Sequence, residues 1–567
     1  MRAIGFLALL ALIPLGAALA QGAALDRIAA ARAAYDRQDW ATAIPLLDQL
    51  VAENPDNGDD RVMLARARFL SKDYARAAGD YAQALALGGF DPAVLEFRIA
   101  QCDAYLGNRP DSLRWLTLAM AHGYRDLAGA QSDPAFATLK SQPEFARLLG
   151  IAPPNLSRDD GWRYDIGFLA GRVEHRSYHP FRTATGDRNV SGALYTQAEF
   201  EAEIARLEND VPKLTDRAIE LRIMRLVASL GDGHTSVWGA RKPEFALTFP
   251  LAFYEFSDGL YIVAAAPQYK NLVGAKVTAF DSTPAGEALA RLDPYIAHDN
   301  SQWFKAMEPQ VIRHVPFLQE IGITKSDNAA DLTVVDSKGV RRTVHVAADM
   351  SQPDIWNAVP KPDGWTWIGD NSSAEFQQRN NENYWMAWHP ESGVLYVQYN
   401  KIEDARDRTL AQFAQALSQQ IAQQPVKKLV IDMRNNNGGD TFLNEPMLKV
   451  IAGNPKVDVP GRFYVIIGRR TFSAAMNAVS YFGRYTNAIF VGEPTGGKPN
   501  APGDEVPFQL PCSGIMLNLS DRYWQGGWPD DFSTWRAPDI TVPVTFADYA
   551  AGKDAATAAI LAQPAPR

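Results

Sequence analysis

The C-terminal third of the chain alternates short apolar runs with amphipathic stretches. The runs Leu429–Met433, Phe463–Ile467 and Ala488–Val491 end at glycine or polar residues, which predicts buried strands. Between the last two, small and apolar residues from Ala474 to Phe482 predict a helix. Strands that alternate with helices are typical of an α/β core, which we place over residues 385–561.

The N-terminal part follows a helical repeat instead. DWATAIPLLDQL aligns with DYARAAGDYAQAL, so Trp40 and Tyr74 lie 34 positions apart, and Pro55 and Pro92 interrupt the helices between copies. Each copy offers two small residues as predicted helix–helix contacts: Ala41 and Ala43, then Ala75 and Ala77. Residues 24–150 are therefore predicted to form tetratricopeptide-like helix pairs, whose surface binds a protein partner or braces the chain. A plain helical bundle is the alternative.

Two further segments lie between the repeats and the core, after a proline-containing linker at Ile151–Asn155. Residues 156–240 form a predicted helical entry segment, in which Thr215–Leu230 has apolar residues at helical spacing before the sequence GDGHT. Residues 245–350 change to short apolar runs with a hairpin around Asp336–Gly339, which predicts a β-rich subdomain. Part of it resembles a degenerate PDZ domain, although a plain β-subdomain has the same pattern.

The start of the chain has the layout of a secretory signal. Met1–Ala20 contains one arginine, an apolar stretch and a small-residue ending, so we expect an exported, periplasmic or extracellular protein with no membrane span after cleavage. A retained N-terminal anchor is the alternative. The formal charge of −9 and the absence of a basic patch argue against a nucleic-acid partner. Only Cys102 and Cys512 are present, in different regions, so we expect no disulfide.

Candidate chemistry gathers around Ser473 and Lys498, which lie 25 positions apart in TFSAAMNAVSYFGRYTNAIFVGEPTGGK. Ser473 stands at the predicted start of a helix, where unpaired N–H groups and the helix dipole favour an oxyanion. Gly438 and Gly439 follow a predicted strand, and with the N–H of Ala474 they are predicted to form an oxyanion hole.

These motifs together resemble the C-terminal processing (tail-specific) serine peptidases and their tricorn-core relatives. The resemblance runs from Tyr164 to Leu561 and includes GDGHT, LVIDMRNNNGGD and VGEPTGGK. It implies a crotonase-like α/β core, with Ser473 as nucleophile. In the lysine branch of the family the base matches Lys498.

The tricorn-like branch uses a histidine and an acidic residue instead. The matching positions here are His234 and Asp531, with Asp530 as a competing position. Two flanks of the lysine turn depart from the family pattern, Gly496 and Pro499, and Asp440 stands where a third glycine is common.

The choice of base stays open at this stage. A lysine must lose about 3 pKa units to be neutral at pH 7, whereas a histidine is already near its working range. The simpler interpretations are an N-cap for Ser473, a solvated turn residue for Lys498, a backbone-bonded loop residue for His234 and a surface acid for Asp531.

The sequence therefore predicts a serine peptidase that cleaves polypeptides by acyl transfer, with neither metal nor cofactor. A non-catalytic peptide-binding scaffold and an esterase-like serine hydrolase are the alternatives.

Overall fold

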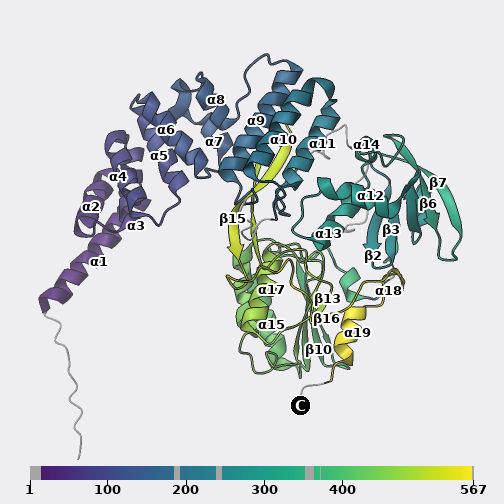
Figure 1. Ribbon diagram of the computed structural model, residues 1–567. Coiled ribbons are helices and arrows are strands. Elements are labelled where there is room, and N and C mark those ends of the chain that lie inside the picture. The colour runs from purple at the N-terminus through teal and green to yellow at the C-terminus, as the bar shows by residue number, and fades with distance from the viewer. Residues whose placement is uncertain (1–14, 184–191, 238–245, 351–362, 371, 565–567) are drawn as a thin grey trace, which may run out of the picture. The chain divides into compact units, whose positions relative to one another are not determined.

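The computed structural model describes residues 15–183, 192–237, 246–350, 363–370 and 372–564, with side chains from residue 25 (Figure 1). It divides into two compact units, Met1–Leu156 and Ser157–Arg567. Most of the predicted signal sequence Met1–Ala20 lies outside the described residues. No described helix is long and apolar enough to cross a membrane.

The first unit is built from consecutive helices that contact their neighbours along the chain. They are α1 (Leu15–Asp36), α2 (Trp40–Glu53), α3 (Gly58–Leu70), α4 (Tyr74–Leu87), α5 (Pro92–Tyr105), α6 (Arg109–Ala121), α7 (Leu127–Ser132), η1 (Pro134–Thr138) and α8 (Pro143–Leu149). Ala43 and Ala77 are fully buried, but Ala41 and Ala75 are exposed, so the predicted contact role of the latter two is wrong. Residues two positions apart on a helix point about 200° apart and cannot share one contact face.

The second unit opens with three helices, α9 (Arg158–Arg176), α10 (Gln197–Asp210) and α11 (Asp216–Ala228). Thr215 caps α11 by accepting a hydrogen bond from the N–H of Ala218, which confirms the predicted helix between Thr215 and Leu230 to within two residues. A short strand, β1 (Ser236–Val237), then joins a three-stranded sheet with β15 (Met516–Gln525) and β14 (Asn500–Gln509).

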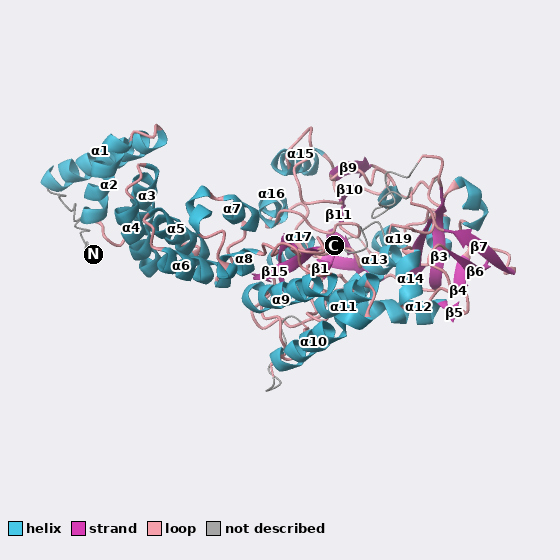
Figure 2. Cartoon of the chain, turned by 90° about the horizontal axis from the view of Figure 1, so that it is seen from above, coloured by secondary structure: helices cyan, strands magenta, loops and turns pink. Residues whose placement is uncertain are grey.

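A second sheet follows, with the strand order β2-β3-β4-β6-β7. Figure 2 shows its strands β3, β4, β6 and β7. Its strands and helices are β2 (Leu251–Phe256), β3 (Gly259–Ala265), β4 (Lys276–Phe280), β5 (Thr283–Pro284), α12 (Ala285–Leu292), α13 (Ser301–Val311), α14 (Val315–Glu320), β6 (Ala329–Val335), β7 (Arg341–Ala347) and β8 (Thr366–Trp367). The N–H of Gly339 donates to Asp336 O at 2.9 Å between the antiparallel strands β6 and β7, which confirms the predicted hairpin.

The core is a six-stranded sheet in the order β16-β13-β12-β11-β10-β9, parallel except for β9. Its elements are β9 (Tyr384–His389), β10 (Val394–Tyr399), α15 (Leu410–Gln423), β11 (Lys428–Asp432), η8 (Thr441–Asn444), α16 (Glu445–Ile451), β12 (Phe463–Ile467), α17 (Ala474–Tyr485), β13 (Ile489–Gly492), β16 (Ile540–Thr541), α18 (Phe546–Ala550) and α19 (Ala555–Ala562). The predicted α/β class is therefore confirmed.

Alternate residues of the core strands pack on opposite faces of this sheet. Leu429, Ile431 and Val465 belong to one apolar cluster with helices α15, α16 and α17. Val430 and Tyr464 belong to a second cluster with α19, which lies on the other face (Figure 1). Burial on both faces explains why these strands read as nearly continuous apolar runs.

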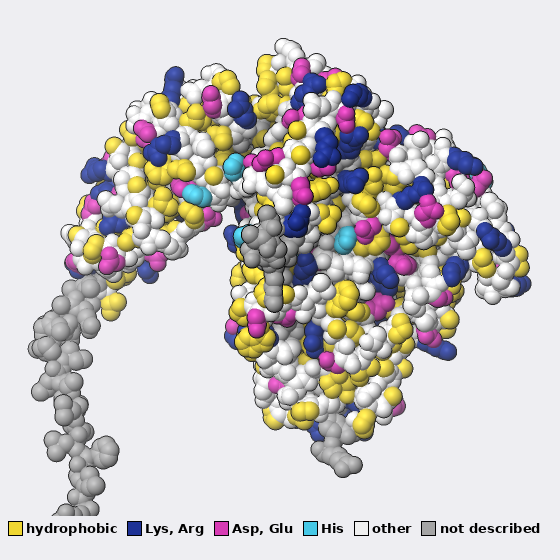
Figure 3. All heavy atoms as spheres, viewed as in Figure 1, with side chains coloured by type: hydrophobic (Ala, Val, Ile, Leu, Met, Phe, Trp, Pro, Cys, Tyr) yellow, Lys and Arg dark blue, Asp and Glu magenta, His cyan; other side chains and the backbone are white. Residues whose placement is uncertain are grey.

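The molecular surface carries both signs of charge. On the face shown in Figure 3, Lys and Arg side chains are interspersed with Asp and Glu. Cys102 and Cys512 are both free cysteines in the structure.

Candidate active site

Three neighbouring parallel strands end at the same edge of the core sheet and deliver most of the predicted site. β11 leads into the loop that contains Gly438 and Gly439, β12 leads to Ser473, and β13 leads to the turn that carries Lys498. Because parallel strands place their C-terminal ends together, segments distant in sequence meet at this edge.

Ser473 has a strained backbone directly before α17. Its φ is 54° and its ψ is −129°, and its side chain makes no capping hydrogen bond with the helix. A non-glycine residue in such a conformation costs about 1–3 kcal/mol, a strain that is concentrated at functional sites. Ser473 is therefore not an ordinary N-cap, and its strand-to-helix turn has the character of a nucleophile elbow.

Gly438, the first residue of the glycine pair, lies directly against this serine. A Cβ built on Gly438 would be 2.7 Å from Ser473 Cβ and 3.0 Å from Ala474 N, so only glycine fits there. The N–H of Gly438 donates to Asn436 Oδ1 at 2.9 Å, so this N–H is already bound within its own loop. Gly439 and Ala474 both line the cavity that contains Ser473.

His234 reaches the same cavity from the loop after α11. The Asp232 carboxylate shapes this loop by accepting the N–H groups of His234 (3.0 Å) and Thr235 (2.9 Å). It also accepts the Ser520 hydroxyl at 2.6 Å, which ties the loop to β15. The imidazole packs against Phe472, with ring centroids 4.4 Å apart, and its Nδ1 is buried without a hydrogen-bond partner among the described residues.

Lys498 is half-buried and lines the cavity as well. Its turn is bonded to the segment before the serine, because the N–H of Gly497 donates to Thr471 O at 3.1 Å. The departure at Gly496 has a steric reason, since a Cβ there would be 2.3 Å from Arg469 O. Pro499 O in turn accepts the N–H of Gly526 at 3.2 Å, so this flank of the turn is also held in place.

Asp299 is a site residue that sequence reasoning missed. It is 8% exposed, lines the cavity with Ser473, and accepts the N–H of Gly233 through Oδ1 at 2.8 Å. Its Oδ2 is buried without a partner among the described residues. Burial raises the pKa of Asp299, and the charges of Lys498 and His234 act in the opposite direction.

The neighbouring Asn300 explains how Asp299 is placed. Asn300 caps α13, and its side-chain amide donates to Gly496 O at 2.9 Å and to Thr534 O at 2.7 Å. This anchor fixes Asp299 next to the lysine turn. The only sequence signal was the capping pattern AHDNSQW, which says nothing of its proximity to Ser473.

The shared cavity has a volume of about 280 Å³ and brings together Ser473, Ala474, Gly439, His234 and Lys498. Asp531 is not among its lining residues, and the Asp531 carboxylate accepts the N–H of Ser533 at 3.0 Å.

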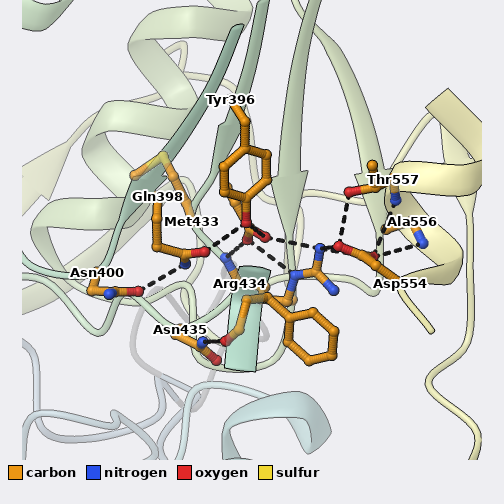
Figure 4. A network of polar contacts seen from close by, with 12 residues as sticks. Tyr396, Gln398, Asn400, Met433, Arg434, Asn435, Asp554, Ala556 and Thr557 are labelled. Carbon is orange, nitrogen blue, oxygen red and sulfur yellow. Dashed lines mark hydrogen bonds and ion pairs between the residues drawn. The ribbon is translucent and has the colours of Figure 1, made fainter. Parts of the chain in front are cut away.

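A second cavity, of about 510 Å³, lies behind the oxyanion loop and is lined in part by Arg434, Asn435 and Asn437. Figure 4 shows the polar network beside it. Arg434 binds Asp432 (2.8 Å) and Asp554 (2.9 Å), and Tyr396 donates to Asp432 at 2.7 Å. This network holds the beginning of the loop that continues to Gly438 and Gly439.

Within the described residues, the cavity brings together a serine hydroxyl, a histidine, a lysine, a buried carboxylate and the backbone of Gly439 and Ala474. No group of three or more His, Cys, Asp or Glu within the described ranges is arranged to hold a metal ion.

Comparison with known proteins identifies the fold. Neither protein-family models nor curated proteins give a match to the sequence. The structure is similar to mature CPAF complexed with lactacystin, with a TM-score of 0.50 and 14% identity over 70% of this chain and 96% of that chain. A further structure of mature CPAF has a TM-score of 0.50 and 13% identity, covering 71% of this chain and 96% of that one.

Other similar structures are the photosystem II D1 C-terminal processing protease (TM-score 0.34, 14% identity, 71% of this chain, 99% of that one) and tricorn protease (0.31, 13%, 72%, 36%). At identities of 13–14%, the likeness to the mature CPAF structures shows the fold alone.

Proposed function

We propose that the protein is a serine peptidase of the C-terminal processing type that acts through an acyl-enzyme. The observation that carries the proposal is the strained, non-capping Ser473 beside Gly438. In this mechanism Ser473 Oγ attacks the peptide carbonyl carbon while a base takes its proton. The base then protonates the leaving amine, and water hydrolyses the ester.

The developing oxyanion is stabilised by the N–H groups of Gly439 and Ala474. Ala474 is the first residue of α17, so its N–H has no acceptor within the helix and the positive end of the helix dipole adds to the effect. Gly438 contributes by fitting closely against Ser473, since its own N–H is bound to Asn436.

The local charges favour His234 over Lys498 as the base. A buried carboxylate such as Asp299 stabilises a neighbouring cation. For a histidine base this stabilises the imidazolium that forms during attack, whereas for a lysine base it stabilises the ammonium that is unable to accept a proton. Asp299 Oδ2 and His234 Nδ1 are also complementary, because a protonated Nδ1 is a hydrogen-bond donor and a carboxylate oxygen is an acceptor.

Asp299 therefore takes the orienting role that the resemblance assigned to Asp531. Lys498 then offsets the negative charge of Asp299, whose pKa it lowers.

The surrounding parts are proposed to act on the polypeptide substrate. The β-rich sheet is proposed to be PDZ-like and to add a substrate segment as a strand, and the core is proposed to be crotonase-like. The helices of residues 24–150 are proposed to be tetratricopeptide-like repeats that bind a protein partner. Export through cleavage after Ala20 is proposed from the sequence pattern, and N-terminal sequencing of the protein purified from its native host tests it.

Fluorophosphonate labelling of the purified protein tests the catalytic proposal. We expect the wild type to form a serine adduct and to cleave casein, and Ser473→Ala, His234→Ala and Asp299→Asn to lose most of both. Ser157→Ala is the matched control, because Ser157 is an ordinary N-cap that accepts the N–H of Asp160. That variant should label like the wild type.

The outcomes separate the alternatives. Loss of labelling in Lys498→Ala with full retention in His234→Ala identifies Lys498 as the base. Labelling without cleavage of any polypeptide favours an esterase-like hydrolase. If the wild type neither labels nor cleaves, the peptidase proposal is wrong and a peptide-binding scaffold is favoured.

A further inference from the structure

A large aromatic side chain stands exposed at the rim of the Ser473 cavity. Phe442 is 78% exposed and lines the cavity together with Ser473 and Ala474. Scattered exposed apolar side chains are common on protein surfaces and need no explanation by themselves. Its place beside the nucleophile and the features below distinguish Phe442 from these.

The backbone around Phe442 is fixed, so its exposure is not the result of a loose loop. Asp440 Oδ1 accepts the N–H of Phe442 at 3.0 Å. Asn477 on α17 donates to Thr441 Oγ1 at 2.9 Å, and Asn444 donates to Ala474 O at 3.1 Å. Hydrogen bonds on both sides of Phe442 thus hold it in a set position relative to the first turn of the catalytic helix.

A second aromatic residue connects Phe442 with the proposed base. Trp524 on β15 meets Phe442 edge to face, with ring centroids 6.0 Å apart and an angle of 65°. A Cβ built on Gly503 would be 3.0 Å from Trp524 Cδ1 and 3.4 Å from His234 Cε1, so Trp524 and His234 approach the same glycine. The aromatic pair therefore continues the wall on which the base lies.

We propose that Phe442 and Trp524 form an apolar subsite that binds a large apolar side chain next to the scissile bond. The inference rests on the proposed function and names its substrate class: polypeptides with an aromatic or large aliphatic residue adjoining the cleaved bond. An aromatic surface that is already fixed in place buries apolar area on binding and loses little conformational entropy, which favours binding. Asp440 and Asp504 also line this cavity, so a preference for a basic side chain is the competing outcome.

Peptide binding to Ser473→Ala protein tests the subsite independently of catalysis. The probes are end-blocked peptides of Gly and Ser with one central Phe, Leu, Ala or Lys. We expect the Phe and Leu peptides to bind about 10-fold more tightly than the Ala peptide. Adding Phe442→Ala should abolish this difference, and Phe442→Leu should restore part of it.

Tyr485→Ala is the matched control, since Tyr485 is also an exposed aromatic residue (52%), at the far end of α17, and is not among the cavity-lining residues. It should leave the preference unchanged. Equal binding of all peptides, tighter binding of the Lys peptide, or a preference that survives Phe442→Ala would overturn the subsite.

Labelling of the wild-type protein keeps the two proposals apart. An apolar preference in the Ser473→Ala protein together with an unlabelled wild type contradicts the peptidase function and retains the subsite. A wild type that is labelled, together with a Ser473→Ala protein that shows no apolar preference, retains the peptidase function and contradicts the subsite.

Discussion

Alanine at position 438 probes the contact between the glycine loop and the nucleophile. Gly438 has a φ of +116°, and a Cβ built on it would be 2.7 Å from Ser473 Cβ and 3.1 Å from Ser473 Oγ. Real Cβ atoms essentially never approach another atom to less than 3.0 Å, so either the loop or the serine must move. Both movements separate the nucleophile from the N–H groups of Gly439 and Ala474.

Gly438→Ala should lose both stability and activity. A side chain at a positive φ destabilises the fold by about 1–2 kcal/mol. Displacing one oxyanion donor lowers the turnover number by about 100-fold to 1000-fold, or about 2.7–4 kcal/mol. We therefore expect Gly438→Ala to remain folded, with a modestly lower melting temperature, and to lose at least about 100-fold in activity.

The assay compares initial rates of fluorophosphonate labelling and of casein cleavage, alongside thermal unfolding. Gly453→Ala is the matched control, because Gly453 also has a positive φ (+72°) but a Cβ there would meet nothing within 4 Å. This control should share the loss of stability and keep the activity.

Two results would contradict the role assigned to Gly438. Gly438→Ala with labelling within about 3-fold of the wild type would show that the glycine loop does not shape the oxyanion site. Equal activity losses in Gly438→Ala and Gly453→Ala would assign the effect to backbone strain alone.

Three further predictions concern titration and strain. Burial raises the pKa of Asp299, so ionisation of this carboxyl lowers the stability of the fold as the pH rises through the folded pKa. Asp299→Asn should therefore leave the melting temperature at pH 7 equal or higher, while kcat/KM falls about 100-fold. Glycine adopts the positive φ of Ser473 without strain, so Ser473→Gly should be about 1 kcal/mol more stable than Ser473→Ala in urea unfolding. The reverse order would show that the backbone of Ser473 is not strained. Burial alone would raise the pKa of Asp554, but Arg434 lowers it on balance, so the ion pair stabilises at neutral pH and this contribution is lost as the pH falls through the folded pKa. Asp554→Asn should therefore cost about 3 kcal/mol at pH 7 and less near pH 3, measured by thermal unfolding.

Local pattern was sufficient for the elements that present Ser473. The strand Phe463–Ile467 was predicted residue for residue, because a strand buried on both faces is an apolar run bounded by turn residues. The two neighbouring strands were each displaced by one residue, as expected where hydrogen bonding rather than composition defines a strand end. Motif spacing then placed Ser473 and Lys498 at one sheet edge.

The position of Asp299 in the cavity could not be predicted from local pattern. It lies 65 positions after His234 and 174 before Ser473, in a segment whose local pattern is only that of a helix cap. Its role depends on a contact between Asn300 and the lysine turn that no periodicity encodes. The wrong prediction at Ala41 and Ala75 has a local cause, because positions two apart on a helix lie on nearly opposite faces and Ala43 and Ala77 occupy the buried one.

The C-terminal helix α19 is tied to the loop of Gly438 and Gly439, although it lies on the opposite face of the sheet from α17. Asp554 caps α19 by accepting the N–H groups of Ala556 and Thr557 at 3.1 Å, and the same carboxylate binds Arg434 at the start of the oxyanion loop (Figure 4). Arg434 lies only four residues before Gly438, in the same loop. Undocking of α19 would remove the Asp554 ion pair of Arg434 and leave its ion pair with Asp432. The ion pair thus links the stability of the C-terminal helix to the geometry that Ser473 requires.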